Sequence, residues 1–130
     1  MATIEDVARL ALALPAVTEG ERWGNTTWLV AGKAFAWLRP FSQADLRRFG
    51  DEPVPDGPIL GVRTADLHEK EAVLAANPDV FFTIPHFDGY SAYLIKLPEV
   101  TDPLLREALL DAWRAVAPSK LAAEVAEGSG

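Results

Sequence analysis

Apolar residues recur at helical spacing in several stretches of the chain. Near the N-terminus such a run extends from Ile4 to Leu14, and Pro15 ends it. Thr3 and Asp6 have the spacing of a capping box at its start. The same reasoning predicts four further helices. One is short and capped by Ser42, one is capped by Thr64 or Asp66 and ends at Asn77, one begins at Thr101 or Asp102, and a short last one restarts at Pro118.

Alternating and continuous apolar runs predict five strands. Residues 26–39 have the pattern of a hairpin with its turn at Ala31 and Gly32, and Ile59–Arg63 forms a third strand. Two more strands, Val80–Ile84 and Ser91–Leu97, flank the connection "PHFDGY". The polar stretch at 16–25 and the proline-rich stretch at 51–58 are predicted to be irregular.

These elements predict an α+β protein whose five-stranded, mostly antiparallel sheet is covered by helices on one face. At 130 residues, without a repeat or a linker, the chain is expected to form a single domain over residues 1–126. The last four residues, 127–130, read "EGSG" and are predicted to be a flexible tail.

The second strand of the hairpin predicts which face the helices cover. Because side chains alternate along a strand, Ala34 and Ala36 share one side, where small residues let a helix approach closely. Phe35 and Trp37 fall on the opposite side. An open aromatic face there would stack nucleic-acid bases or bind a small planar ligand or a protein partner; alternatively, segments 15–25 and 40–57 bury the rings. The candidate ligand-binding residues are Trp28, Phe35, Trp37 and Tyr93.

Charge is distributed unevenly along the chain. The net charge is −7, which argues against a general nucleic-acid binder. Residues 22–63 nevertheless carry six basic and four acidic groups, so the middle of the chain is locally positive. A histidine at a turn, His86, is placed to contact a phosphate or to hydrogen-bond its own loop. The candidate phosphate contacts are Lys33, Arg39, Arg47, Arg48, Arg63 and His86.

Signatures of catalysis are missing from the sequence. There is no cysteine, no nucleophile elbow, and no glycine-rich phosphate or dinucleotide loop. His68 and Glu71 have a spacing that can share a metal, but a tight site needs further ligands. We therefore expect a protein that is not an enzyme and has no cofactor or metal. The N-terminal residues predict neither a signal peptide nor a membrane span, so a cytoplasmic location is expected.

The order of several segments resembles the MmcQ/YjbR family along nearly the whole chain. The hairpin "WLVAGKAFAWL", the helix "ADLHEKEAVLAANP", the strand end "YLIKL" and the C-terminal "DAWRAVAPSKL" carry this resemblance. It implies a CyaY-like "double wing" fold with "VAGK" and "PHFDGY" as the wing tips, and DNA as a partner. A non-catalytic module that binds a small molecule or a protein through the aromatic face remains the alternative.

Overall fold

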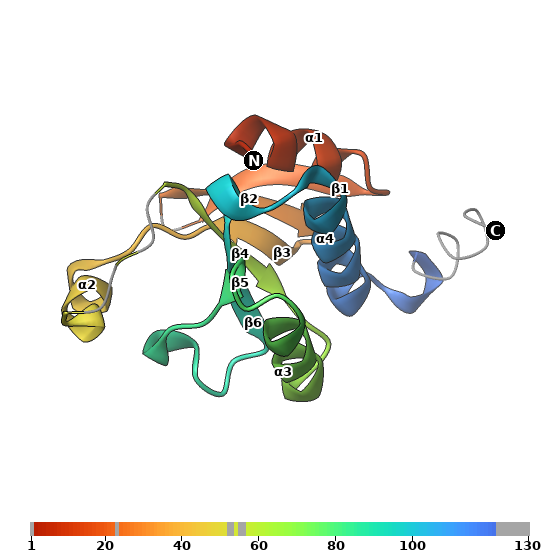
Figure 1. Cartoon of the computed structure of the whole chain (residues 1–130). Coiled ribbons are helices and arrows are strands. Elements are labelled where there is room, and N and C mark those ends of the chain that lie inside the picture. The colour runs from red at the N-terminus through yellow and green to blue at the C-terminus, as the bar shows by residue number, and fades with distance from the viewer. Residues whose placement is uncertain (1, 23, 52–53, 55–56, 122–130) are drawn as a thin grey trace.

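A computed structural model describes residues 2–22, 24–51, 54 and 57–121 of the chain (Figure 1). The predicted tail at 127–130 lies outside these residues. In chain order the elements are α1 (Ile4–Leu12), β1 (Val17–Arg22), β2 (Asn25–Val30), β3 (Lys33–Leu38), α2 (Gln43–Phe49), β4 (Ile59–Arg63), α3 (Leu67–Ala76), β5 (Phe81–Phe82), the 3-10 turn η1 (Pro85–Phe87), β6 (Ala92–Lys96), the 3-10 turn η2 (Leu97–Glu99) and α4 (Asp102–Val116).

Polar caps start the helices where the sequence predicts them. Thr3 and Asp6 form a reciprocal capping box at α1, and Ser42 and Asp45 form a second one at α2. Thr101 caps α4, with Pro103 in its first turn. Each cap satisfies backbone N–H groups that the helix itself leaves unpaired. The predicted starts of these helices are therefore confirmed.

The sheet has six strands, not the predicted five, in the order β1-β2-β3-β4-β6-β5, and every pair is antiparallel. The additional strand is β1, whose residues are almost all exposed. It pairs with β2 through its backbone, so no hydrophobic pattern marks it in the sequence. The strand predicted at 80–84 is reduced to the two residues of β5.

The three longer helices cover one face of the sheet, as predicted. Residues of α1 and α4 form the main core with β2, β3, β4 and β6, and Val73 and Leu74 of α3 pack against its edge. The short α2 lies on the opposite face (Figure 1), where Phe41 and Phe49 join a second, smaller cluster. The protein thus has one densely covered face and one that is covered only in part.

A β-bulge in β3 changes which residues share a face. Trp28 pairs with Ala36 and Leu29 with Ala34, so Phe35 is an extra residue in the ladder. Phe35 and Ala36 consequently both lie in the helix-side core, whereas Trp37 belongs to the cluster on the opposite face. The prediction that Phe35 and Trp37 share an open face is wrong, because strict alternation does not hold across a bulge.

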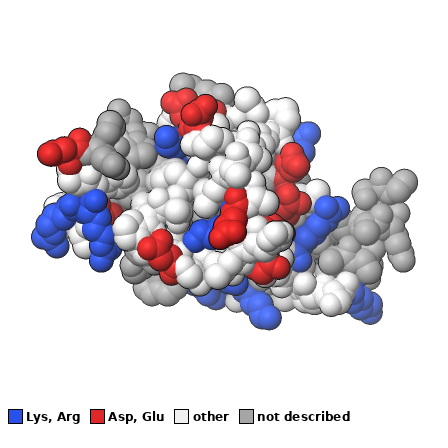
Figure 2. Space-filling model, turned by 60° about the horizontal axis from the view of Figure 1, so that its bottom comes forward, with Lys and Arg blue, Asp and Glu red and all other residues white. Residues whose placement is uncertain are grey.

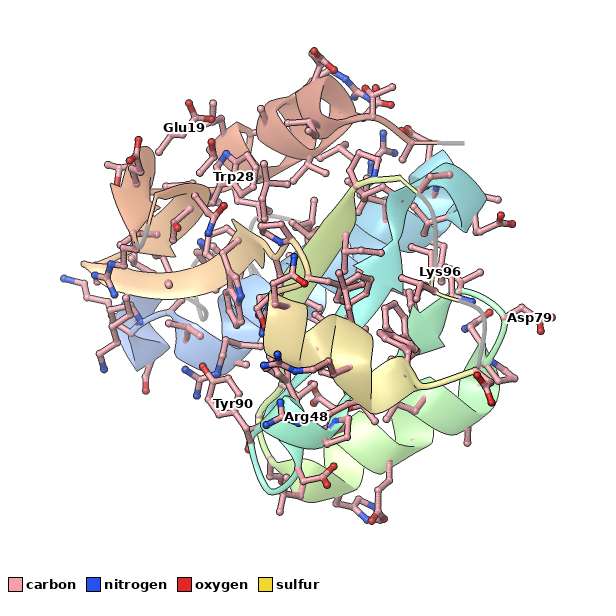
Figure 3. All side chains as sticks on the ribbon, turned by 90° about the vertical axis from the view of Figure 1, so that its left-hand side faces the viewer. Glu19, Trp28, Arg48, Asp79, Tyr90 and Lys96 are labelled. Atoms are coloured by element: carbon pink, nitrogen blue, oxygen red, sulfur yellow. The ribbon has the colours of Figure 1, made fainter. Side chains whose placement is uncertain are left out.

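Two other predicted ligand-binding rings are also buried under the helices. Trp28 is fully buried, like Phe35 in the same core. Its indole N–H donates to the Glu19 carboxylate at 2.9 Å. Figure 3 shows Glu19 and Trp28 at the edge of the sheet. Tyr93 pairs with Val62 and packs on Phe81 in the same core. The expectation that Trp28 and Tyr93 lie on an open face is therefore wrong.

Candidate functional site

A groove of about 1150 Å³ lies on the partly covered face of the sheet. We call it the α2 groove, because α2 forms one wall and the connection at residues 85–90 forms another. The floor comes from β2 and β3, and the far end reaches the last turn of α4. Ligand sites typically have this size and concave form, which makes the groove the candidate functional site.

Trp37 forms the floor of the α2 groove because β4 has a glycine opposite it. Trp37 pairs with Gly61 across the β3–β4 ladder. A Cβ atom at Gly61 would stand only 2.6 Å from Cε2 and 2.7 Å from Nε1 of the indole. The ring therefore lies directly on the backbone of β4, in space that any other residue at position 61 would occupy.

Aromatic side chains continue from Trp37 along the groove. The Trp37 ring centroid is 6.4 Å from that of Phe87 and 6.5 Å from that of Tyr90, and Phe87 and Tyr90 meet edge to face at 5.6 Å. Phe87 is buried, whereas Tyr90 is 42% exposed. Phe41 lines the wall near α2. Aromatic residues thus extend from a buried base to a solvent-exposed ring.

Positive side chains outnumber negative ones in this groove. Among the described residues that line it, Asp45 is the single acid. Five cations line it as well: one each from β1, β3, α2 and β4, and one from the residue that follows β3. This local excess contrasts with the net charge of −7 for the whole chain. The five cations are Arg22, Lys33, Arg39, Arg48 and Arg63.

Asp45 connects two of these cations to the start of α2. Its buried carboxylate lies 3.0 Å from Nη1 of Arg39 and 3.7 Å from Nη1 of Arg48, and it also accepts from the Ser42 backbone N–H at 2.9 Å. Burial raises the pKa of Asp45, but the hydrogen bonds from Ser42 and Arg39 outweigh it and hold that pKa below the ordinary 3.8. Asp45 therefore stays charged and fixes α2 against β3.

The cations differ in how much of their bonding is already used within the protein. Arg39 is mostly buried and stands 5.7 Å from the Phe87 ring centroid. Arg63 donates from Nε to the Ser91 carbonyl at 3.3 Å and stands 5.3 Å from the Tyr90 ring centroid. Arg48 has 47% of its side chain exposed, and Lys33 is exposed at the β2–β3 turn. Arg48 and Lys33 are therefore the cations best placed to contact a ligand.

A buried lysine holds the connection that carries Phe87 and Tyr90. Lys70 of α3 is only 6% exposed, and its ammonium group donates to the carbonyls of Phe87 at 2.7 Å and Tyr90 at 2.9 Å. Burial lowers the pKa of Lys70 from the ordinary 10.5, although nearby Asp88 raises it in part. Lys70 thus ties this wall of the groove to α3. The helix "DLHEKE" drew attention to its histidine, and only the fold reveals the role of the lysine.

The structure brings together some of the predicted binding residues. Lys33, Arg39, Arg48 and Arg63 all line the α2 groove, whereas Arg47 is exposed on α2 outside it. His86 lies in η1, and its side chain is outside the described part of the structure. From the predicted aromatic set, Trp37 alone lines the groove. Among the cationic and aromatic residues of the groove, sequence reasoning missed Arg22, Phe41, Phe87 and Tyr90.

The described part of the chain shows no arrangement for metal binding or membrane insertion. Nowhere in it do three or more histidine, aspartate or glutamate side chains cluster as metal ligands would. Each helix in the same residues is too short or too polar to cross a bilayer.

The fold places the chain among small α+β proteins with an open antiparallel sheet. Protein DR2400 of Deinococcus radiodurans, a DUF419 domain, has a similar structure, with a TM-score of 0.67 at 18% identity over 97% of this chain and 89% of that one. The YjbR family model matches residues 12–115, and the chain belongs to this family. Uncharacterized proteins of Mycobacterium bovis and Mycobacterium tuberculosis are each 42% identical to it over 133 residues, covering both chains completely.

Proposed function

We propose that this chain binds DNA through the α2 groove and catalyses no reaction. The observation that carries the proposal is that the described residues lining one aromatic groove include five cations and a single acid, in an otherwise acidic protein. Cations attract the phosphates of nucleic acids, and a concave wall focuses their field. The rings supply surfaces on which bases stack.

The cations have two different roles in this proposal. Lys33 and Arg48, which are exposed, contact phosphates directly. Arg39 and Arg63 are engaged with Asp45 and with the Ser91 carbonyl, so they contribute positive potential more than new hydrogen bonds. Arg47 does not line the groove, so in this proposal it contributes less to DNA binding than Arg48 does.

The face beside the groove supports a localised contact, not a broad one. Figure 2 shows positive and negative side chains interspersed over the surface that includes α3 and the 85–90 connection, without a continuous positive area. A protein that wraps duplex DNA over a wide surface needs such an area. Contact confined to the groove does not.

The chemistry of the groove supports binding without catalysis. Among its described lining residues there is no histidine, and the carboxylate of Asp45 is held by Arg39 and Ser42. The Ser42 hydroxyl accepts the Asp45 backbone N–H as a helix cap. Neither residue forms the nucleophile and base pair that group transfer requires.

A second candidate function is the binding of a small planar molecule on Trp37. The contact between the indole and Gly61 favours it, because it leaves a flat ring at the base of a groove of ligand size. In this case binding would quench or shift tryptophan fluorescence and depend little on salt. A protein partner that inserts an aromatic side chain at the same place would also change the tryptophan fluorescence and bind with little dependence on salt.

Fluorescence anisotropy with labelled DNA at low salt tests the proposal. We expect binding whose logarithm falls linearly with the logarithm of salt concentration, with a slope of about −0.7 to −0.9 for each phosphate neutralised. Arg48→Gln should weaken binding and reduce that slope by roughly one contact, whereas Arg47→Gln, an identical charge change on the same helix, should have little effect. Absence of binding to any DNA at low salt would overturn the proposal and leave the small-molecule function.

A further inference from the structure

We infer that the α2 groove takes an unpaired strand of DNA, with one base stacked on Tyr90 and the next near Trp37. This inference rests on the proposed function and specifies the form of DNA that the groove recognises. Three observations carry it: the exposed position of Tyr90, the rigidity of the connection that holds it, and the distribution of cations around the rings.

Tyr90 has the properties of a stacking platform. It is one of the few large apolar or aromatic side chains that the described structure exposes, at 42%, and it lies in the groove and not at a scattered surface position. Arg63 stands over its ring at 5.3 Å from the centroid, and Phe87 meets it edge to face. These two contacts fix the ring, and its remaining exposed surface is available to a base.

The backbone around Tyr90 is held in place before any ligand arrives. The Tyr90 carbonyl accepts a hydrogen bond from Lys70 at 2.9 Å, and its N–H donates to the Phe87 carbonyl at 3.0 Å. Lys70 is itself buried in α3 and contacts the Phe87 carbonyl. Because the ring is already ordered, stacking on it costs little conformational entropy.

The exposed cations lie around the rings at positions that suit a strand. Arg48 projects from α2, and Tyr90 lies on the 85–90 connection; Figure 3 labels both on the side of the molecule that carries α2. Both residues line the groove, and Lys33 lines it from the β2–β3 hairpin. A strand whose base stacks on Tyr90 therefore has a cation for the adjoining phosphate. This alternation of rings and cations is typical of single-strand binding sites.

Duplex DNA does not satisfy the same contacts. In a duplex the flat faces of the bases are covered by their neighbours, so neither Tyr90 nor Trp37 could stack on them. The aromatic residues at the base of the groove would remain unused, and only the cations at its rim would contribute. The groove therefore discriminates between the two forms through its rings more than through its charge.

The test compares three DNA probes of equal length by anisotropy: a single-stranded oligo-dT, the same strand annealed to its complement, and an abasic strand. We expect the single strand to bind more tightly than either of the others. Tyr90→Ala should weaken single-strand binding roughly tenfold, the equivalent of one stacked base, and Tyr90→Phe should retain it. Leu67→Ala, which truncates a similarly exposed side chain on α3, is the control and should leave binding unchanged.

The outcomes separate this inference from the function on which it rests. If duplex binds as tightly as single strand and Tyr90→Ala has no effect, the inference is overturned while DNA binding stands. If the abasic strand binds as well as oligo-dT, stacking is excluded in the same way. If no probe binds at low salt, DNA binding itself fails. Circular dichroism of each variant confirms that the fold is retained in every comparison.

Discussion

The two faces of the sheet differ in how completely they are covered. On the helix-covered face, Trp28, Phe35 and Trp113 are fully buried. On the α2 groove face, Trp37 is half-buried and Tyr90 is 42% exposed. Burial of large apolar side chains is the main stabilising contribution to folding, whereas exposed rings contribute little to it. The helix-covered face therefore contributes more of the buried surface that stabilises the fold, whereas the groove face leaves aromatic surface open to solvent.

Truncating one ring on each face gives the largest expected effect. Phe35→Ala leaves a cavity in the helix-covered core and should lower the free energy of unfolding by about 4 kcal/mol. Trp37→Ala should lower it by about 2 kcal/mol or less, since the indole is only half-buried. Urea unfolding of the two variants measures the difference. Similar losses of unfolding free energy in both variants would show that the two faces contribute equally to stability and would contradict this comparison.

Removing the charge of Asp45 should weaken the groove wall. Asp45→Asn disrupts a buried ion pair and should lower the free energy of unfolding by about 3 kcal/mol at neutral pH. Asp102→Asn, whose carboxylate pairs with Arg9 at the surface, is the control and should lose less than about 1 kcal/mol.

The Asp45 effect should also depend on pH. Because the pKa of Asp45 is held below 3.8 in the folded protein, its stabilising contribution is fully present above that value. The contribution is lost as the pH falls through the folded-state pKa, where the carboxylate takes up a proton. The stability gap between wild type and Asp45→Asn should therefore narrow in acid. A constant gap down to pH 2 would show that the carboxylate is not responsible.

A methyl group added at Gly61 of β4 should disturb the α2 groove and not the helix-covered core. Gly61→Ala places Cβ 2.6 Å from the Trp37 indole and must displace that ring, at an expected cost of about 1–3 kcal/mol. Binding of a ligand that contacts Trp37 should be lost, and the tryptophan emission should shift. Gly20→Ala in β1, where the new Cβ meets Leu29 at 3.4 Å, should change neither stability nor binding. If Gly61→Ala and Gly20→Ala had the same stability, tryptophan emission and ligand affinity, Trp37 would not be part of the binding site.

The smallest expected effect concerns the hairpin turn. Ala31 and Gly32 both have positive φ, at 52° and 77°, which is the geometry of a type I′ turn. Alanine tolerates this conformation poorly, whereas asparagine is favoured in it. Ala31→Asn should therefore raise the free energy of unfolding by about 0.5–1 kcal/mol and leave the groove unchanged. A thermal melt combined with the binding assay tests both parts.

Local signals in the sequence predicted local structure well. The capping boxes at Thr3 and Ser42 involve residues three positions apart, so they are visible in the sequence itself. The positions of β2, β3, β4 and β6 followed from their apolar patterns. Lys33 and Arg63, two of the predicted phosphate contacts, lie at strands that the sequence predicted, and both line the groove.

Features that depend on pairing between distant segments could not be predicted. The bulge at Phe35 becomes visible when β2 and β3 are paired residue by residue, and it reversed the predicted face of that ring. The fit of Trp37 on Gly61 depends on the β3–β4 register. Tyr90 joins the groove because Lys70, twenty positions earlier, holds its carbonyl. None of these relations leaves a periodic pattern in the sequence.

The bulge at Phe35 also determines how relatives with a shorter β3 should be aligned with this chain. Removing one residue between Ala34 and Trp37 would restore even pairing while leaving Trp37 opposite Thr27, so the later positions of the strand would keep their sides. The indole of Trp37 would stay on the groove face, and the helix-covered core would lose one of the two consecutive residues that the bulge directs into it, Phe35 or Ala36. A relative that is one residue shorter at this point should therefore be aligned with its gap at the bulge, and its equivalent of the indole sought opposite the equivalent of Thr27.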